Sequence, residues 1–195
     1  MILKLRRWSS LLGVRVGNGD IIMSRTWVIS DTHFGHKGVT QFLRKDGSKL
    51  RPWDHPDEMD EALVANWNSV VEPRDRVYHL GDVAINRRAL PILNRLNGRK
   101  VLVKGNHDIF KLSDYVKYFD DIRAYVVGKF GPDKMYVMSH VPVHESQLYR
   151  FNINIHGHLH SDTLDDPRYI NVSVEQINYT PIELTELCKR VFATD

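Results

Sequence analysis

The sequence predicts a mixed α/β fold with two β-sheets, the first parallel and the second rich in antiparallel pairs. Between residues 25 and 103, short apolar runs alternate with amphipathic segments, which is typical of parallel strands joined by right-handed crossovers. Later in the chain, strand-like runs follow one another, and a turn signal at residues 130–133 indicates a hairpin. No repeat or linker interrupts the chain, so we expect residues 1–195 to form one domain.

The elements of the first half follow from hydrophobic spacing. The strongest is a helix over residues 56–71, in which Met59, Leu63 and Trp67 fall on one face. Pro91 lies inside another predicted helix, where a proline fits only in the first turn. The predicted elements of this half are strands at 25–30, 76–80 and 100–103 and helices at 37–45, 56–71 and 86–97.

The second half is predicted to contain mainly strands. A short helix is expected over 113–119 and a C-terminal helix over 181–192, with strands at 122–129, 134–139, 151–155 and 169–174. Residues 1–23 begin with a charged, apolar segment, but Ser9, Gly13 and Arg15 interrupt it and no cleavage site follows. We therefore interpret residues 1–23 as an N-terminal extension or an added strand.

The composition limits the classes of protein to which this chain can belong. Cys188 is the only cysteine, so an intramolecular disulfide and a thiolate metal cluster are both excluded, and the reducing cytoplasm is the expected compartment. No stretch is long and apolar enough to span a bilayer, so we expect no membrane association. A net charge of +3 without a continuous basic stripe permits a nucleic acid as partner but does not indicate one.

Polar side chains follow most of the predicted strands. Carboxylates and imidazoles are good ligands for divalent cations such as Mn, Fe, Zn and Ni. In Asp31-x-His33 and His158-x-His160, the two side chains of each pair point the same way if the backbone is extended. Pairs from distant segments are typical of centres in which two cations lie about 3.5–4 Å apart. The residues collected in this way are Asp31, His33, Asp82, Asn106, His107, His140, His158 and His160.

The predicted strand at 100–103 leads into the polar sequence Gly105-Asn106-His107-Asp108. Glycine can adopt backbone angles that a side chain forbids, so we expect Gly105 to make a sharp turn there. A single histidine at the end of a strand is more often a hydrogen-bonded structural residue than a ligand. The shared position of these residues after strands favours a common site.

The order of these motifs resembles the calcineurin-like metallophosphoesterase superfamily. Asp-x-His, Gly-Asp, Gly-Asn-His-Asp, an isolated histidine and Gly-His-x-His all occur in sequence between about residues 26 and 175. The length of the chain is similar to that of the small, uncapped bacterial, archaeal and phage phosphodiesterases of this superfamily. The resemblance implies a four-layer αββα sandwich with two mixed β-sheets.

The resemblance also implies two divalent metal ions as cofactors, with Mn favoured and Fe, Ni or Zn as alternatives. A hydroxide bridging the two ions would attack the phosphorus. Asp31, His33 and His160 would hold the first ion, Asn106, His140 and His158 the second, and Asp82 would bridge them.

The remaining candidate residues would act on the substrate. His107 would face the substrate and protonate the leaving oxygen, and Asp108 would orient His107 or hold the loop. Asn106 and His36 are further candidates for contact with the substrate.

The predicted function is hydrolysis of a small phosphate ester, with a nucleotide among the candidates. Phosphodiesters are favoured because small uncapped members of the superfamily often cleave them. A phosphomonoesterase, acting on nucleotides or proteins, is the alternative enzyme. A non-catalytic scaffold of the same fold is the alternative from another class, but it should lack a ligand or His107, and all of these positions are filled. A homo-oligomer is left open.

Overall fold

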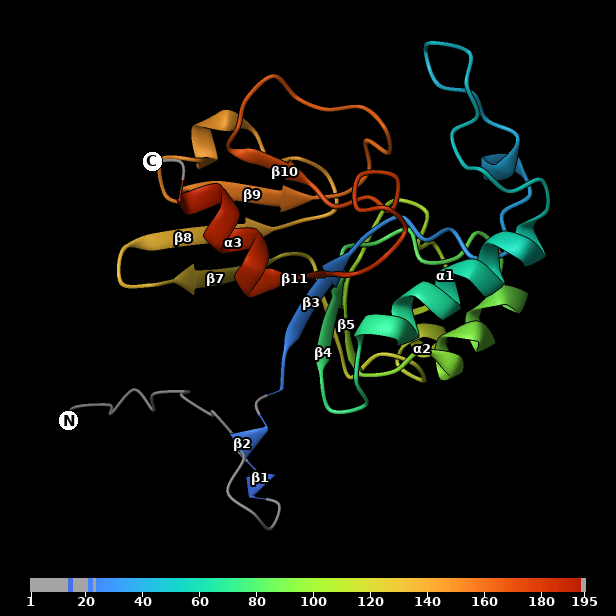
Figure 1. Cartoon of the computed structure of the whole chain (residues 1–195), viewed down its shortest axis with the longest axis horizontal. Helices are drawn as coiled ribbons and strands as arrows, with labels where there is room; N and C mark the ends of the chain where they lie inside the picture. Colours follow the sequence, from blue (N-terminus) through green and yellow to red (C-terminus); the bar gives the residue numbers. More distant parts are fainter. Residues whose placement is uncertain (1–13, 16–20, 23, 194–195) are drawn as a thin grey trace.

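Two mixed β-sheets pack face to face in the computed structural model of the chain (Figure 1). The structure describes residues 14–15, 21–22 and 24–193. The first sheet has the order β11-β3-β4-β5-β6 and the second the order β10-β9-β8-β7. The strands of the first sheet are β3 (Thr26–Ile29), β4 (Arg76–His79), β5 (Arg99–Val103), β6 (Asp121–Arg123) and β11 (Ile182–Glu183). Those of the second are β7 (Val126–Phe130), β8 (Lys134–Met138), β9 (Ile153–His156) and β10 (Tyr169–Asn171).

The strand directions confirm the predicted class of fold but correct one detail. Strands β3, β4, β5 and β6 are parallel, and β11 joins β3 antiparallel. In the second sheet only β7 and β8 are antiparallel, whereas β8–β9 and β9–β10 are parallel. The prediction of a second half rich in antiparallel pairs is therefore wrong. Residues 131–133 join the antiparallel pair, and the longer connections after β8 and β9 carry the chain back to the starting edge of the sheet, as parallel pairing requires.

Several predicted elements differ in detail. Of the helices expected at 37–45 and 113–119, only residues 38–40 and 112–115 are helical. The strand expected at 122–129 is two strands, β6 and β7, which belong to different sheets. The helix expected at 86–97 is the 3-10 helix η2 (Arg87–Arg95), in which Pro91 removes a backbone donor that an α-helix would use. The C-terminal segment begins with β11 before the helix α3 (Leu184–Phe192). The short helical elements are η1 (Gly38–Thr40), α2 (Leu112–Tyr115) and η3 (Glu145–Gln147).

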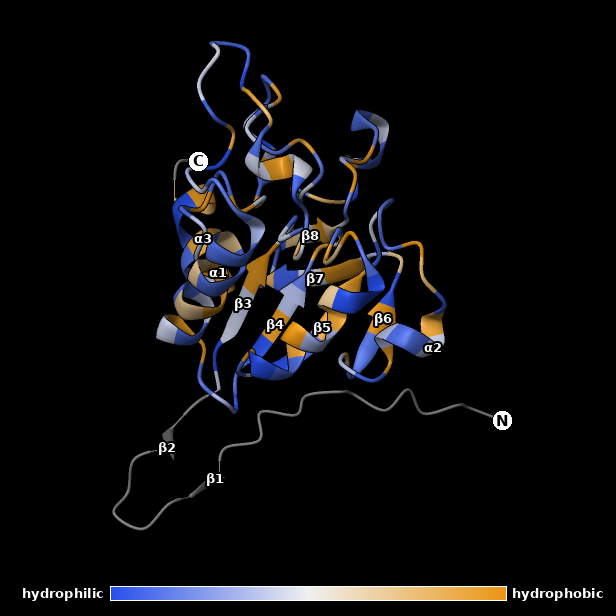
Figure 2. Cartoon of the chain, turned by 90° about the vertical axis from the view of Figure 1, so that its right-hand side faces the viewer, coloured by the Kyte–Doolittle hydropathy of each residue, from blue (hydrophilic) through white to orange (hydrophobic). Residues whose placement is uncertain are grey.

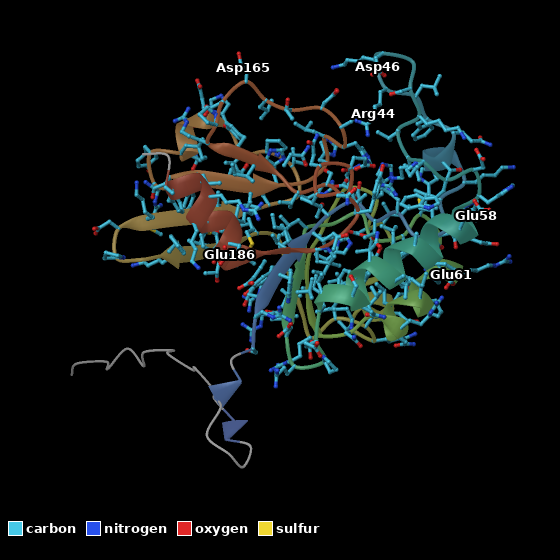
Figure 3. All side chains as sticks on the ribbon, viewed as in Figure 1. Arg44, Asp46, Glu58, Glu61, Asp165 and Glu186 are labelled. Atoms are coloured by element: carbon cyan, nitrogen blue, oxygen red, sulfur yellow. The ribbon has the colours of Figure 1, made fainter. Side chains whose placement is uncertain are left out.

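Helix α1 (Pro56–Val70) and η2 cover the outer face of the first sheet. Met59, Leu63 and Trp67 are buried in one core with Ile29 of β3, as the helical spacing predicts. The opposite face of α1 is charged, and Glu58 and Glu61 project from it away from the sheet (Figure 3).

A second core joins the two sheets. Val28 and Leu80 from the first sheet pack with Met138 and Ile155 from the second, and α3 adds Leu187. Hydrophobic residues occur in the strands of both sheets and in the helices (Figure 2). The second core fixes the sheets relative to each other, and the loops at the strand ends remain available for chemistry.

The N-terminal residues include two very short strands. Strand β1 (Val14–Arg15) pairs antiparallel with β2 (Ile21–Ile22) in a sheet of its own, separate from the two main sheets. The rest of the predicted extension over 1–23 lies outside the described residues. None of the helices in the described part of the chain has the length and apolar character that a membrane crossing requires.

Replacement of Leu63 by alanine tests the packing of α1. Leu63 is 2% exposed in the first core, so Leu63→Ala should lower the free energy of unfolding by about 2–5 kcal/mol, measured by urea denaturation. Glu58→Gln on the exposed face is the matched control and should change it by less than about 0.5 kcal/mol. Equal effects of the two substitutions would contradict the assigned packing.

Candidate metal centre

The loops that carry the predicted ligands meet at one edge of the two sheets. Asp31, Asp82 and Gly105 follow β3, β4 and β5, and the carboxyl ends of parallel strands lie at the same edge. His140 and His158 follow β8 and β9, which are parallel to each other. Backbone hydrogen bonds tie these loops together, including one from the Asp31 N–H to the Gly81 carbonyl (3.0 Å).

Asp31, His33 and His160 form the first cluster. One ligand atom from each lies within 4.8 Å of the others. His33 Nε2 is 3.8 Å from Asp31 Oδ1, and His160 Nε2 is 4.0 Å from the same oxygen. Asp31 Oδ1 and both ring nitrogens of His33 are buried without a hydrogen-bond partner. Buried polar atoms normally have a hydrogen-bond partner, so these unpaired oxygen and nitrogen atoms are suited to act as ligands of a divalent cation.

Asp82, His140 and His158 form the second cluster, again within 4.8 Å. Asn106 Oδ1 lies 2.8 Å from His140 Nε2, so the amide oxygen belongs to the same group. Asp82 Oδ2 is 3.4 Å from His140 Nε2 and 3.7 Å from His33 Nε2 of the first cluster. One carboxylate oxygen thus faces both clusters, which is the arrangement expected of a bridging ligand.

Hydrogen bonds orient two of the imidazole rings. His140 Nδ1 lies 2.7 Å from the Leu80 carbonyl oxygen, and His160 Nδ1 lies 3.1 Å from Glu175 Oε1. Carbonyl and carboxylate oxygens accept hydrogen bonds, so Nδ1 carries a proton in both rings. Nε2 of each ring is then the nitrogen that faces the cluster, as metal-binding histidines require.

The backbone at these residues is strained. Five of the seven non-glycine residues with positive φ in the described part of the chain are predicted ligands. The prediction of an extended backbone at the two paired motifs is therefore wrong, because both members of each pair are left-handed. Such conformations cost about 1–3 kcal/mol each and are typical of functional sites. The φ values are 59° at Asp31, 50° at His33, 55° at Asp82, 69° at His158 and 51° at His160.

Gly105 and Gly157 allow the loops to approach closely. Gly105 does not have a positive φ, so the predicted reason for a glycine there is wrong. A Cβ at Gly105 would instead collide with Asp82, and one at Gly157 would collide with Asp31. The glycines are required because neighbouring loops occupy the space that a side chain would fill.

The chain is similar in sequence to proteins of a known family. The sequence pattern of the calcineurin-like phosphoesterases matches residues 24–179. The chain belongs to this family. It is 32% identical over 180 residues to an uncharacterised protein of Methanocaldococcus jannaschii, covering 87% of this chain and 92% of that protein. It is 30% identical over 170 residues to the gene 66 protein of Mycobacterium phage L5, covering 71% and 79%.

A solved structure agrees with the fold of this calcineurin-like phosphoesterase. The crystal structure of a protein of unknown function from Aquifex aeolicus is similar, with a TM-score of 0.67 and 28% identity. The match covers 86% of this chain and 99% of that one. The two mixed sheets are therefore shared with a protein whose structure is known.

Asp108 holds the loop that follows β5 in place. Its buried carboxylate accepts hydrogen bonds from the N–H groups of Asp82 (2.9 Å), Val83 (3.0 Å) and Gly105 (2.8 Å). Two roles were predicted for Asp108, to hold the loop or to orient His107. The structure shows the hydrogen bonds that hold the loop. The orientation of the His107 ring by Asp108 is not seen, because the carboxylate is directed at backbone groups.

His107 and His36 lie at the mouth of the centre. The exposed His107 ring is 5.6 Å from that of His33 between centroids, and the half-buried His36 ring is 5.5 Å from it. The N–H of His107 donates to Asp82 Oδ1 (2.8 Å), so the same carboxylate that faces both clusters also anchors the His107 backbone. These positions leave both rings accessible to a substrate above the clusters.

Sequence reasoning missed two residues behind the centre, Arg51 and Glu175. Their side chains form an ion pair that is 0% exposed, with 2.8 Å between Arg51 Nη2 and Glu175 Oε1. Glu175 comes directly after the strand predicted at 169–174, which is the signal that identified the other polar residues. Nothing in the sequence near Arg51 indicates that it is buried.

The charges of the centre favour cation binding. Burial raises the pKa of Asp82, but the hydrogen bond and charge of His140 and the His107 N–H outweigh it and hold this pKa at about 2. Burial lowers the pKa of His33 far below its usual value, so this ring is neutral and can offer a lone pair. For His140 and His160, burial alone would lower the pKa, but nearby carboxylates outweigh it and raise the pKa.

The raised pKa values of His140 and His160 predict a pH trend for metal affinity. Because cations compete with protons for His140 and His160, Mn²⁺ affinity should rise as pH increases from about 6.5 through the raised pKa values, then level off.

Calorimetric Mn²⁺ titrations over a pH series check this trend. The His55→Ala variant is the control, because His55 is exposed and its side chain makes no capping hydrogen bond. An Mn²⁺ affinity that is constant or falls with increasing pH would contradict the assigned protonation.

Proposed function

We propose that the protein hydrolyses phosphate esters, with diesters preferred, at a centre of two divalent cations. The observation that carries this proposal is the position of Asp82, whose Oδ2 faces His33 at 3.7 Å and His140 at 3.4 Å. When bound, two cations at such a centre lower the pKa of a water molecule and neutralise the phosphate oxygens during attack. The family to which the chain belongs supports action on phosphate esters.

The side chains that would hold the cations supply nitrogen and oxygen donors. This donor set suits Mn²⁺, with Fe, Ni and Zn as alternatives. The residues are Asp31, His33 and His160 for one cation, Asn106, His140 and His158 for the other, and Asp82 between them. The unpaired buried atoms at Asp31 and His33 support this assignment, since a cation would satisfy them.

His107 is the residue proposed to move a proton. Its backbone is fixed by the hydrogen bond to Asp82, and Asp108 fixes the loop on which it lies. The exposed ring at the mouth can donate a proton to the leaving alkoxide, a contribution of about 10²–10⁴ in rate for a well-placed acid. His36, whose ring centroid lies 5.5 Å from that of His33, is proposed to contact the substrate.

A cavity beside the second cluster supports a diester as substrate. Its volume is about 440 Å³, and Asn106 and His140 of the cluster form part of its wall. Tyr125, Val141 and Val143 give the cavity apolar walls, which suit the uncharged second substituent of a diester. A phosphomonoester has no such group. A scaffold without catalysis remains the outcome if no ester is cleaved.

Replacement of His107 by alanine tests the proposed reaction. With Mn²⁺ present, the wild-type protein should cleave a bis-aryl phosphate, and His107→Ala should lower kcat by about 10²–10⁴ with both cations still bound. The control is His55→Ala, which removes an exposed histidine that belongs to neither cluster. Full activity of His107→Ala would refute the proton-transfer role, and no cleavage by the wild type would favour the scaffold.

Replacement of Tyr125 by alanine tests the preference for diesters. Tyr125 is 60% exposed in the wall of the cavity, so Tyr125→Ala should raise KM for an aryl diester by about 3–10-fold, the loss of one aromatic contact. Hydrolysis of the matching aryl monoester should not change. Tyr149→Ala is the control, because Tyr149 is exposed and does not line this cavity. A parallel rise in KM for both esters would contradict the assigned pocket.

A further inference from the structure

Arg51 and Glu175 are two opposite charges in the interior of the protein. Both side chains are 0% exposed, and the residues lie 124 positions apart in the sequence. Arg51 Nε and Nη2 each lie 2.8 Å from Glu175 Oε1. A buried pair of this kind is a poor way to gain stability, since an apolar pair of similar volume is often at least as good. The other contacts of Arg51 and Glu175 therefore offer a better explanation for the buried pair than stability does.

The other donors of Arg51 reach the loop that carries two predicted ligands. Nη2 donates to the Asp31 carbonyl at 2.6 Å, and Nη1 donates to the Thr32 carbonyl at 2.8 Å. This loop has a positive φ at Asp31 and at His33, a conformation that needs support from its surroundings. The guanidinium group provides two hydrogen bonds to the strained backbone.

Glu175 reaches a third ligand of the same cluster. Its Oε1 accepts a hydrogen bond from His160 Nδ1 at 3.1 Å, which leaves Nε2 of that ring to face Asp31. The second oxygen, Oε2, is buried without a hydrogen-bond partner. The carboxylate is thus directed at Arg51 and His160, although one of its own oxygens remains unpaired.

The second cluster has a different support. His140 is oriented by the Leu80 carbonyl, and the Asp82 loop is held by the Asp108 carboxylate. Neither Arg51 nor Glu175 makes a hydrogen bond to His140, His158 or Asn106 in the described part of the chain.

We propose that Arg51 and Glu175 act as a positioning pair that sets the geometry of Asp31, His33 and His160, and so controls cation affinity at the first cluster but not at the second. The inference rests on the metal centre proposed above. Both residues act through the ligands, since neither is itself directed into the clusters.

A double replacement separates positioning from support of the fold. Arg51→Met together with Glu175→Leu removes both charges and leaves no unpaired ion in the interior, so the variant should fold with a wild-type circular dichroism spectrum. Its melting temperature should be lower, because the Asp31 and Thr32 carbonyls lose their donors. Mn²⁺ titration of the metal-free variant should show first-cluster affinity reduced by about 10–100-fold and second-cluster affinity unchanged.

A second variant tests the hydrogen bond to His160. Glu175→Gln keeps an acceptor for Nδ1, so its effect on the first cluster should be smaller than that of the double variant. The ¹⁵N shifts of the His160 ring in Zn²⁺-loaded protein, assigned with His160→Gln, should show a protonated Nδ1 in the wild type and in Glu175→Gln. In the double variant, the ¹⁵N shift of His160 Nδ1 should differ from the wild-type value.

Asp75→Asn is the matched control. Asp75 is also buried, but its carboxylate binds the Arg25 N–H and Trp27 Nε1 at the opposite end of β3. This variant should lose stability and keep both cation affinities. Wild-type affinity at both clusters in the double variant, or equal losses at both, would overturn the positioning role. A wild-type protein that binds no cation would overturn the metal centre itself.

Discussion

The Asp82 carboxylate is the interaction on which the centre depends. Its Oδ2 faces an imidazole of each cluster, and its Oδ1 accepts the His107 N–H, so one side chain links both proposed cation sites to the proposed acid. Asp82 itself is held in a left-handed conformation by the Asp108 carboxylate, which binds its N–H. The left-handed conformation of Asp82 costs conformational energy, which packing and hydrogen bonds must offset in the metal-free protein. Cations that bind only the folded state would add to its stability.

The rest of the fold supplies the rigidity that this arrangement needs. Two apolar cores fix the sheets, and the strands bring loops from distant parts of the sequence to one edge. The loops then approach so closely that Gly105 and Gly157 have no room for a side chain. All proposed ligands except Asn106 are buried or half-buried, whereas His107 lies exposed at the mouth. The structure thus separates the groups suited to hold cations from the group suited to exchange protons with a substrate.

Much of the fold and of the candidate site could be predicted from the sequence, because a buried strand that ends in polar residues leaves a clear local signal. The signal was clear for Asp31 after β3 and for His158 after β9. Features that depend on contacts distant in sequence could not be predicted in the same way. The parallel pairing of β8 with β9 and the ion pair between Arg51 and Glu175 are of this kind. The left-handed backbone at His33 was also missed, since an alternating motif looks the same on an extended strand.

The most direct measurement of the central claim is the number of cations bound per chain, before and after the change Asp82→Asn. Calorimetric titration of the metal-free protein with Mn²⁺ should show two sites. In Asp82→Asn, which keeps the shape of the side chain but removes its charge, both sites should weaken together. A wild-type protein with fewer than two sites, or an Asp82→Asn variant with one site unchanged, would contradict a centre bridged by this carboxylate.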